Sequence, residues 1–501
     1  MYTICKLLYV TVFALLSAAP PYLPLYYDAV LGFSSDQIGF VLAIAPFVQS
    51  VACPLWTFLV DKRPHLHGSV MALTSFLGGI SLLGIMGLGH SIRTTSVVLN
   101  DTTVVICTSA LAFAFAFFTL PNTSLVDSAV MKILGPDKLL YGEQRLWGSL
   151  STGLTILLVG QLISYTGNLD ALFWVFGGST LAFVVCAAVA NVNSNDIVLP
   201  LEDLETEYAQ QPLMSPSNQS MEKYGHRAPA NYLSTTHAAS SLRPHEQFKG
   251  HDPLIFKAAS IVSAHTVREE AEEALDVVGV DLGLAISRIS SVDQSLMLAP
   301  DAEVPPADVF KSPRVLCFLT TTLIFGVVLS MIVNFLFLFL SREMHTPASW
   351  IGWTGPMSGV TELLCFCFSK QMTEKFGVTK MVVIAHVATL IRCLAYTVLV
   401  PDSLITNIIA LLLQMLHGIG FGIFWATAVS EIDSFFPPEQ RAVAQGILGA
   451  LHAGLGTGLG AFIGGYLLEY CGSVWLFRVA ALLTLISTVI FCVGRLKRYN
   501  F

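Results

Sequence analysis

Residues 315–340 read VLCFLTTTLIFGVVLSMIVNFLFLFL, and none of these positions is acidic, basic or histidine. An α-helix rises about 1.5 Å per residue, so a helix of this length is long enough to cross a hydrocarbon core of about 30 Å. Backbone polar groups in lipid must bond within their own segment, which only a helix or a closed barrel allows. The stretch therefore predicts a membrane-spanning helix.

The composition of the whole chain agrees with that prediction. Only 12% of its 501 residues are Asp, Glu, Lys or Arg, whereas 54% are hydrophobic. A typical soluble protein has about 25% charged residues. So few charges cannot cover a water-soluble surface of this size. The chain is predicted to be an integral membrane protein whose first partner is the lipid bilayer, and no basic region favours nucleic acid.

Eleven further stretches are long and apolar enough to span a bilayer. The twelve predicted spans are 7–31, 38–60, 69–90, 103–128, 146–166, 171–191, 314–340, 349–369, 379–400, 403–430, 442–468 and 474–494. The first resembles a signal peptide around Ser17-Ala18-Ala19, but its apolar run continues to Leu31, so we expect it to be retained. The predicted fold is an all-α membrane protein of twelve transmembrane helices.

The spans divide into an N-terminal six-helix bundle (1–191) and a C-terminal six-helix bundle (313–501), joined by a loop (192–312). That loop holds 18 acidic and 8 basic residues and no span. It is rich in Ser, Pro, His and Asn, which is typical of disorder. We expect a disordered cytoplasmic connection that carries no chemistry of its own.

Basic residues indicate the orientation of the spans. Short segments on the side that holds both termini carry 13 Lys and Arg residues, against only Arg93 and Arg342 in short loops on the other side. The positive-inside rule predicts that both termini are cytoplasmic. Asn100-Asp101-Thr102 is a glycosylation pattern in a predicted outer loop, which agrees with this topology. We expect a multi-pass protein of the plasma membrane.

Acid–base motifs recur at equivalent inner turns of the two bundles. They are Asp61 and Lys62 after the second span, Glu374 and Lys375 after the eighth, Glu143 with Arg145 at the fifth, and Glu439 with Arg441 at the eleventh. Acids at helix N-termini are also ordinary capping residues. The recurrence in both bundles favours a cytoplasmic gate, whose charges pair in one conformation and separate in another.

With these motifs the chain resembles the major facilitator superfamily. The resemblance rests on the six-plus-six plan, the acid–base turns and the glycine-rich eleventh span that ends in GGYLLEYCG at 464–472. Two further stretches, PPYLPLY at 20–26 and YGEQRLWG at 141–148, resemble the branch of sugar–proton and nucleoside–proton symporters. The resemblance implies two bundles that rock around a site near the middle of the membrane.

Three ionisable residues lie near the middle of predicted spans: Glu362, Arg392 and His417. A charged side chain there costs about 2.5–3.5 kcal/mol on insertion scales, which suggests a function or an obligatory partner. We expect a proton-coupling cluster in which Arg392 holds Glu362 ionised until substrate or a conformational change withdraws it. Glu362 would then take up a proton, and His417 would relay it or bind a substrate hydroxyl. The alternative is a structural Glu–Arg pair sealed between helices.

Asp127 and Arg145 are a second candidate pair. In lactose permease-like symporters an acid and an arginine on the fourth and fifth helices bind the sugar, so the resemblance implies this role here. Asp127 lies near the end of its span, where a structural pair that reaches water is an equal alternative. Two departures are Gly420, where those symporters have an acid, and Thr152, where they have a tryptophan.

Uncharged polar residues within spans could also bind a polar solute. The candidates are Gln49, Asn122, Asn334 and Gln414. Hydrogen bonds between helices are an equally good explanation for them. His386 and His452 are interpreted as packing residues with satisfied polar groups, which is the commoner state of buried histidine.

The sequence thus predicts a secondary active transporter, a proton-coupled symporter of a small polar solute such as a sugar or nucleoside. Its partners would be that solute and the proton, it would act as a monomer, and no cofactor or metal is expected. The alternatives are an uncoupled facilitator and a non-transporting scaffold or receptor. An enzyme is not expected, because the chain has no nucleophile–base or metal-ligand motif.

Overall fold

A computed structural model describes residues 2–94, 100–135, 140–190, 192, 309–436 and 441–496, with only the backbone of residues 370, 441 and 442. The predicted loop 192–312 lies almost wholly outside the described residues. The described helices belong to one compact unit, Met1–Asp196 with Gly279–Phe501. We call residues 2–192 the N-terminal half and residues 309–496 the C-terminal half.

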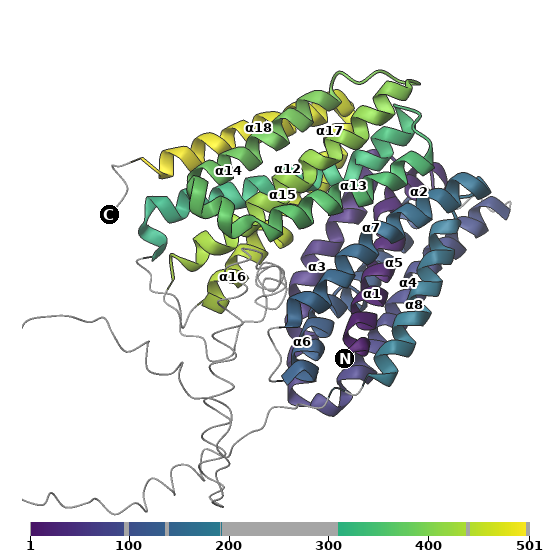
Figure 1. Cartoon of the computed structure of the whole chain (residues 1–501). Coiled ribbons are helices and arrows are strands. Elements are labelled where there is room, and N and C mark those ends of the chain that lie inside the picture. Colours follow the sequence, from purple (N-terminus) through teal and green to yellow (C-terminus); the bar gives the residue numbers. More distant parts are fainter. Residues whose placement is uncertain are drawn as a thin grey trace, which may run out of the picture. The chain divides into compact units, whose positions relative to one another are not determined.

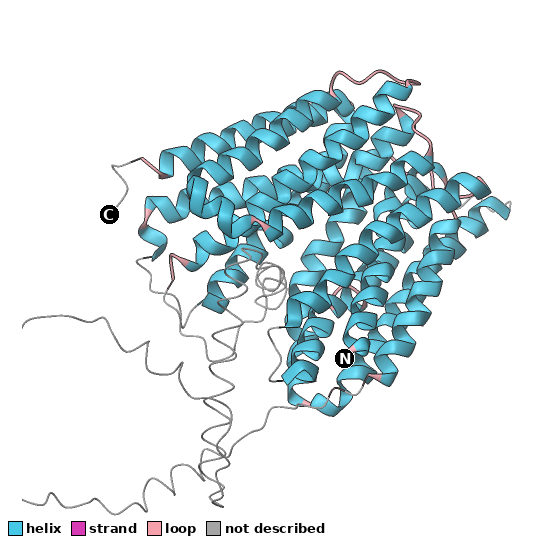
Figure 2. Cartoon of the chain, viewed as in Figure 1, coloured by secondary structure: helices cyan, strands magenta, loops and turns pink. Residues whose placement is uncertain are grey.

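The described chain is almost entirely helical (Figures 1 and 2). Its N-terminal half contains α1 (Thr3–Ala18), η1 (Pro20–Tyr22), α2 (Leu23–Ala29), α3 (Ser35–Lys62), η2 (Pro64–Leu66), α4 (His67–Thr94), α5 (Asp101–Phe118), α6 (Asn122–Leu134), α7 (Tyr141–Thr166) and α8 (Ala171–Val189). Its C-terminal half contains η4 (Val309–Lys311), α12 (Pro313–Arg342), α13 (Ala348–Cys367), α14 (Ser369–Tyr396), α15 (Leu404–Asp433), α16 (Arg441–Gly449), η6 (Ala450–Gly456), α17 (Thr457–Cys471) and α18 (Ser473–Gly494).

Within the described residues, 11 helical segments are long and apolar enough to cross a membrane. The twelfth predicted span is α13, which has the length to cross at 20 residues but is more polar. Its polar residues include Ser358, Thr361 and Glu362. Because α13 packs between α7 and α15, these residues lie on a helix with protein on at least two sides. The prediction of twelve transmembrane helices is confirmed.

Proline breaks two of the long spans. Pro20 and Pro21 separate α1 from α2 through a 3-10 turn, and Pro121 precedes α6 at the break after α5. Proline lacks the N–H that the helix needs and its ring clashes with the preceding turn, so both breaks are expected. A third interruption is at Gly377 in α14, where φ of 76° lies in the left-handed region that glycine tolerates. The predicted ninth span, 379–400, thus begins just after this kink, and the part of α14 that starts at Ser369 is a separate helical piece before it.

The helices of each half pack mainly against one another. In the N-terminal half α1 packs on α7 and α8, while α4 packs on α5 and α8. In the C-terminal half α12 packs on α17 and α18, and α15 packs on α13 and α14. The largest contacts between the halves are those of α3 with α17 and of α7 with α13, and smaller ones join α12 with α2 and η1, and α3 with η6. Residues at these junctions decide how the halves meet.

Candidate functional site

Among the described residues, Arg392 on α14 is the largest fully buried side chain, with 1% of its surface exposed. Its guanidinium makes three hydrogen bonds. Nε donates to the Tyr396 hydroxyl at 3.2 Å, Nη2 donates to Gln414 Oε1 at 3.2 Å, and Nη1 lies 3.0 Å from His417 Nδ1. Gln414 also donates to the Tyr396 hydroxyl at 2.8 Å. The partners found among the described residues are all uncharged, so this buried cation is held by dipoles rather than by a carboxylate.

Glu362 on α13 is half-buried and makes no hydrogen bond or ion pair with any residue that the structure describes. Its helical turn is pressed against two glycines of α15. A Cβ added at Gly418 would lie 2.6 Å from the Glu362 nitrogen, and one at Gly422 would lie 3.4 Å from its Cα. Among the described residues, Arg145 of α7, in the other half, lies close enough for its positive charge to act on this carboxylate.

The expected pairing of Arg392 with Glu362 is not formed in this structure. The reason is the geometry of α15, which lies between the two residues. Its Gln414 and His417 face α14 and occupy the guanidinium of Arg392. Its Gly418 and Gly422 face α13 and the backbone of Glu362. Sequence reasoning placed the residues at one depth, but it could not give the rotation of the helix between them.

Asp127 and Arg145 do belong to one buried cluster, centred on Tyr9. The Asp127 carboxylate on α6 is fully buried and accepts hydrogen bonds from the hydroxyls of Tyr9 at 2.5 Å and Tyr141 at 2.9 Å. The Arg145 guanidinium lies over the rings of Tyr9 and Phe13, 5.4 and 4.3 Å from their centroids. Cations over aromatic faces are attracted by the ring quadrupole. Asp127 is therefore enclosed by protein, and Arg145 packs over the aromatic rings of the same cluster.

Some of the uncharged polar candidates hydrogen-bond other described residues through their whole side-chain amide, and others do not. Asn122 donates to the backbone carbonyls of Phe118 and Thr119 and accepts from Thr74. Its amide therefore supplies hydrogen bonds to the backbone where the helix breaks before Pro121. Gln414 is occupied by Arg392 and Tyr396, as described above. Asn334 donates to the Ser330 hydroxyl and is half-buried. Gln49 is half-buried with no hydrogen bond to a described residue.

Polar contacts between the halves lie near one end of the helices, which we call the Ser35 end after the first residue of α3. The Ser35 amide donates to the Glu469 carboxylate of α17 at 2.7 Å. Arg342 of α12 pairs with Asp28 of α2 at 3.4 Å. We call these two contacts the latch. Both join one half to the other.

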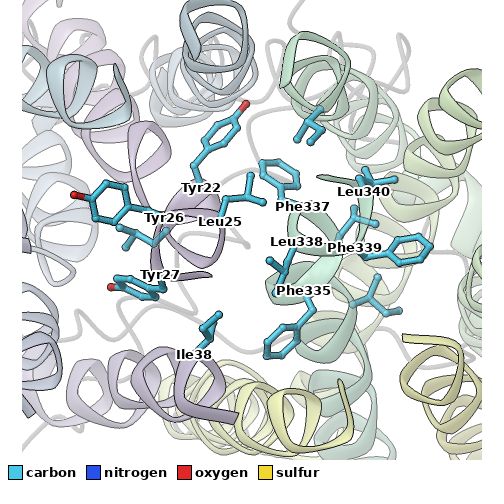
Figure 3. Packing of buried hydrophobic residues seen from close by; sticks show 14 of the residues in the cluster. Tyr22, Leu25, Tyr26, Tyr27, Ile38, Phe335, Phe337, Leu338, Phe339 and Leu340 are labelled. Atoms are coloured by element: carbon cyan, nitrogen blue, oxygen red, sulfur yellow. The ribbon is translucent and has the colours of Figure 1, made fainter. Parts of the chain in front are cut away.

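Close packing of glycine seals the same end. A Cβ on Gly39 would lie 2.8 Å from the Cα of Gly465, and one on Gly160 would lie 2.7 Å from the Cα of Gly352. Only glycine lets helix backbones approach so closely. An aromatic contact adjoins these junctions: the rings of Tyr22 and Phe337 are 5.0 Å apart within a buried cluster drawn from both halves (Figure 3).

The predicted gate residues lie at the opposite end, which we call the Lys62 end. The ion pairs that the structure describes there stay within a half. Asp61 pairs with Lys132 at 2.8 Å and Glu143 with Lys6 at 2.7 Å. In the C-terminal half Glu431 pairs with Arg314 and Arg495. The described halves are thus bound to each other at the Ser35 end, and these charges at the Lys62 end bind neighbours in their own half.

The remaining predicted sites have simpler positions. Lys62 and Lys375 lie over the rings of Phe58 and Phe376, and Glu374 is exposed. Glu439 and the Arg441 side chain lie outside the described residues. Asn100 is exposed and caps α5 by accepting from the Thr102 amide at 3.4 Å. Its predicted glycosylation stays a prediction.

Sequence reasoning missed the tyrosines that organise both buried clusters. Tyr396 lies four residues after Arg392, the spacing that places two side chains on one helix face, so it could have been found. Tyr9 approaches Asp127 from a helix more than a hundred residues away in the sequence, and no local pattern indicates it. The Ser35–Glu469 contact was missed for the same reason.

The known proteins that this chain resembles in sequence are membrane transporters. A sequence model described as the MFS_1 like family matches residues 2–479. The maltose permease of Geobacillus stearothermophilus is 27% identical over 189 residues, covering 38% of this chain and 43% of that protein. The putative nucleoside transporter YegT of Escherichia coli (strain K12) is 28% identical over 120 residues, 24% of this chain and 28% of that protein. The chain thus matches less than half the length of these relatives.

Solved structures resemble this chain over almost its whole length. The nucleoside transporter NupG is 14% identical with a TM-score of 0.66, covering 98% of both chains. A bacterial homologue of the iron transporter ferroportin, 14% identical, has a TM-score of 0.58 in its inward-facing state, over 99% of this chain and 98% of that one. In its outward-facing state it is 13% identical with a TM-score of 0.51, over 98% of both chains. These proteins are membrane transporters and share the fold.

Proposed function

Because this chain belongs to the MFS_1 like family, we propose that it is a secondary active transporter rather than an enzyme, and that it couples a proton to the movement of a small polar organic solute. A nucleoside or a sugar is the solute class that its relatives suggest, since those relatives include a putative nucleoside transporter and a maltose permease. A multi-pass transporter of this kind works by alternating access, in which the two halves rock around a site near the middle of the membrane.

The observation that carries the proposal is the carboxylate of Glu362. It sits in a transmembrane helix without a bonding partner among the described residues, and the charge that acts on it belongs to Arg145 of the opposite half. A carboxylate in a membrane interior is expensive and is retained for function by default. Because its electrostatic partner moves with the other half, rocking of the halves would change its affinity for a proton. That link is what symport requires.

The other polar groups take supporting roles in this proposal. Arg392 and His417 form a rigid polar wall on α14 and α15, and the half-buried His417 ring would receive a proton or a substrate hydroxyl. Gln49, Asn334 and Arg145 have groups that could meet a solute between the halves. Asp127 and Gln414 would act through the partners that they hold, and Asn122 would stabilise the helix break.

The latch and the glycine contacts suggest which side of the membrane is open. We assign the Ser35 end to the outside and both termini to the cytoplasm, as the basic residues predict. The structure would then be an inward-facing state, sealed outside and released inside. The higher TM-score against the inward-facing ferroportin homologue agrees with this assignment. A monomer in the plasma membrane is the corresponding cellular form.

The test is transport by purified protein in liposomes with and without an imposed proton gradient. We expect the wild type to accumulate uridine or maltose against the concentration gradient of that solute when the liposome lumen is alkaline. Glu362→Gln should lose that accumulation but keep exchange of labelled for unlabelled solute, since it removes the proton site without removing the substrate site. Glu343→Gln is the matched control, because Glu343 bonds Ser473 within its own half.

Other outcomes would contradict the proposal in different ways. Solute transport that does not depend on the proton gradient, in both the wild type and Glu362→Gln, would indicate an uncoupled facilitator. Accumulation that persists in Glu362→Gln would remove Glu362 from the coupling role. A wild-type protein that binds solute without moving it would favour a receptor that has kept the fold.

A further inference from the structure

One turn of the eleventh span is a π-helix. Between α16 and α17, η6 (Ala450–Gly456) has the wider i→i+5 bonding pattern. Such turns are rare, occur mostly as single insertions in α-helices, and are frequent at functional sites. His452 lies in this turn and is 6% exposed. The extra residue of a π-turn changes which way the side chains of the helix point, so the orientation of His452 is set by this local feature.

Two buried ring nitrogens near this turn lack partners. His452 Nε2 and Trp425 Nε1 are both inaccessible and have no hydrogen bond to a residue that the structure describes. The Trp425 side chain on α15 is 5% exposed, and its ring centroid lies 4.9 Å from that of His452. Burying such a group without a partner costs about 1–3 kcal/mol. His452 therefore has a ring nitrogen without a partner among the described residues, whereas both ring nitrogens of His386 are bonded, to Val382 and Ser487.

The surroundings of these nitrogens are aromatic. His417, Phe421 and Trp425 follow one another at four-residue spacing along α15, with near-parallel rings 6.2 and 6.0 Å apart. Phe424 adds a further ring 5.9 Å from His452. His417 and Phe421 at one end of this aromatic ladder are half-buried, whereas Trp425 at the other end is buried.

The π-turn also lies at the junction of the halves. A Cβ on Gly454 would be 2.8 Å from the Ser50 hydroxyl of α3, and one on Gly326 of α12 would be 2.7 Å from the His452 carbonyl. Gln49, whose amide has no hydrogen bond to a described residue, is the neighbour of Ser50. A group held by His452 and Trp425 would therefore be near residues of both halves.

We propose that His452 and Trp425 form a subsite for the nucleobase of a nucleoside. The indole N–H donates to an acceptor on the base, and the imidazole nitrogen donates or accepts according to its tautomer. Two polar groups set among aromatic rings suit a flat heterocycle, whose faces are apolar and whose edge is polar. A sugar ring suits them less, because its many hydroxyls would find few partners there. The inference rests on the proposed function and narrows its substrate class from sugar or nucleoside to nucleoside.

Ligand binding in detergent tests the subsite separately from transport. The measurement is the rise in melting temperature of the full-length protein with uridine, adenosine or maltose. Trp425→Phe keeps the ring and removes the N–H, and His452→Leu removes the polar nitrogens. The matched controls are Trp56→Phe, whose indole already donates to the Phe117 carbonyl, and His386→Leu, whose nitrogens are both bonded.

We expect at least one nucleoside to stabilise the wild type and maltose not to do so. Trp425→Phe and His452→Leu should each weaken nucleoside affinity by about tenfold, the loss of one hydrogen bond. The controls should lower the melting temperature without ligand yet leave nucleoside affinity unchanged. If Trp425→Phe and His452→Leu behave like the controls, the two nitrogens are bridged by a buried water and the inference is wrong.

The remaining outcomes separate this inference from the proposed function. Stabilisation by maltose alone, or by no nucleoside, overturns the subsite while leaving transport of another solute open. Nucleoside binding that depends on Trp425 and His452, in a protein that fails to transport, supports the subsite and contradicts the proposed function.

Discussion

Arg392 is a buried cation whose neighbours are neutral, and this determines how a substitution there should behave. Its planar guanidinium directs three N–H groups at Tyr396, Gln414 and His417 at once. A lysine ammonium on a flexible stem keeps the charge but cannot match this fixed geometry. The positive charge would then remain buried with fewer partners, which is the costly case for a polar group in a low-dielectric interior.

Arg392→Lys is therefore expected to reduce solute uptake by about tenfold or more, the effect of losing one to two hydrogen bonds to a charged group. The measurement is initial uptake into liposomes at matched protein content. Arg478→Lys is the control, because the Arg478 side chain is exposed and packs only over Trp475 among the contacts described. Equal uptake by the two variants would show that charge alone, without geometry, is needed at position 392.

Tyr9 offers a test of whether the Asp127 cluster is structural. Tyr9→Phe removes the donor to the fully buried carboxylate but keeps the ring beneath Arg145. We expect a loss of about 1–3 kcal/mol in unfolding free energy, because a buried acceptor loses a partner. Tyr165→Phe is the control, since Tyr165 is 90% exposed. Thermal unfolding of the two variants measures this loss of stability. Weaker solute binding at unchanged stability would instead place the cluster in the substrate site.

Between elements, the backbone contact of α7 with α13 should control opening at the Ser35 end. A Cβ on Gly160 would lie 2.6 Å from the Ala348 carbonyl, a distance that real side chains do not adopt. Gly160→Ala should therefore hold the halves apart and disfavour the observed state. A Cβ on Gly178 of α8 would meet open space. Gly178→Ala should therefore be neutral or slightly stabilising, because alanine is the better helix former.

The readout is labelling of a cysteine placed at Phe337, in a protein without its native cysteines, by a thiol reagent that cannot cross the membrane. Phe337 is buried in the contact with Tyr22. Gly160→Ala should raise the labelling rate about tenfold, which corresponds to a shift of 1.4 kcal/mol between states. If Gly178→Ala raises it equally, the close contact is not what seals this end.

The extent to which the sequence predicts this architecture follows from the physics of each feature. Span length and hydropathy are local properties, so residues 315–340 predicted α12 well, and even the polar α13 was recognised from its length. Partner choice is not local. Glu362 and Arg392 were placed at one depth, but the rotation of α15 between them depends on packing by Gly418 and Gly422. The π-turn at His452 breaks the regular spacing on which helical patterns rely, so no periodicity indicates it.

For the molecule as a whole, alternating access requires that contacts between halves be weak enough to break in every cycle. The seal at the Ser35 end combines apolar packing with three described polar contacts: Ser35 with Glu469, Asp28 with Arg342, and the Gln161 amide with the Ser349 carbonyl. The Asp28–Arg342 pair is partly exposed, and exposed ion pairs contribute about 0–1 kcal/mol. Glu469 has the better geometry, because a carboxylate at the N-terminus of α3 also meets the positive end of the helix dipole.

Glu469→Ala is accordingly expected to favour the state that opens at the Ser35 end by roughly threefold to tenfold, the effect of one hydrogen bond of about 0.5–1.5 kcal/mol. Glu343→Ala is the matched control, because the Glu343–Ser473 contact lies at the same end but within the C-terminal half. The labelling assay at position 337 reports both variants. Faster labelling in Glu469→Ala alone supports a latch between the halves. No change would mean that glycine and aromatic packing hold this end closed unaided, and the polar contacts would then serve only to align α3 with α17.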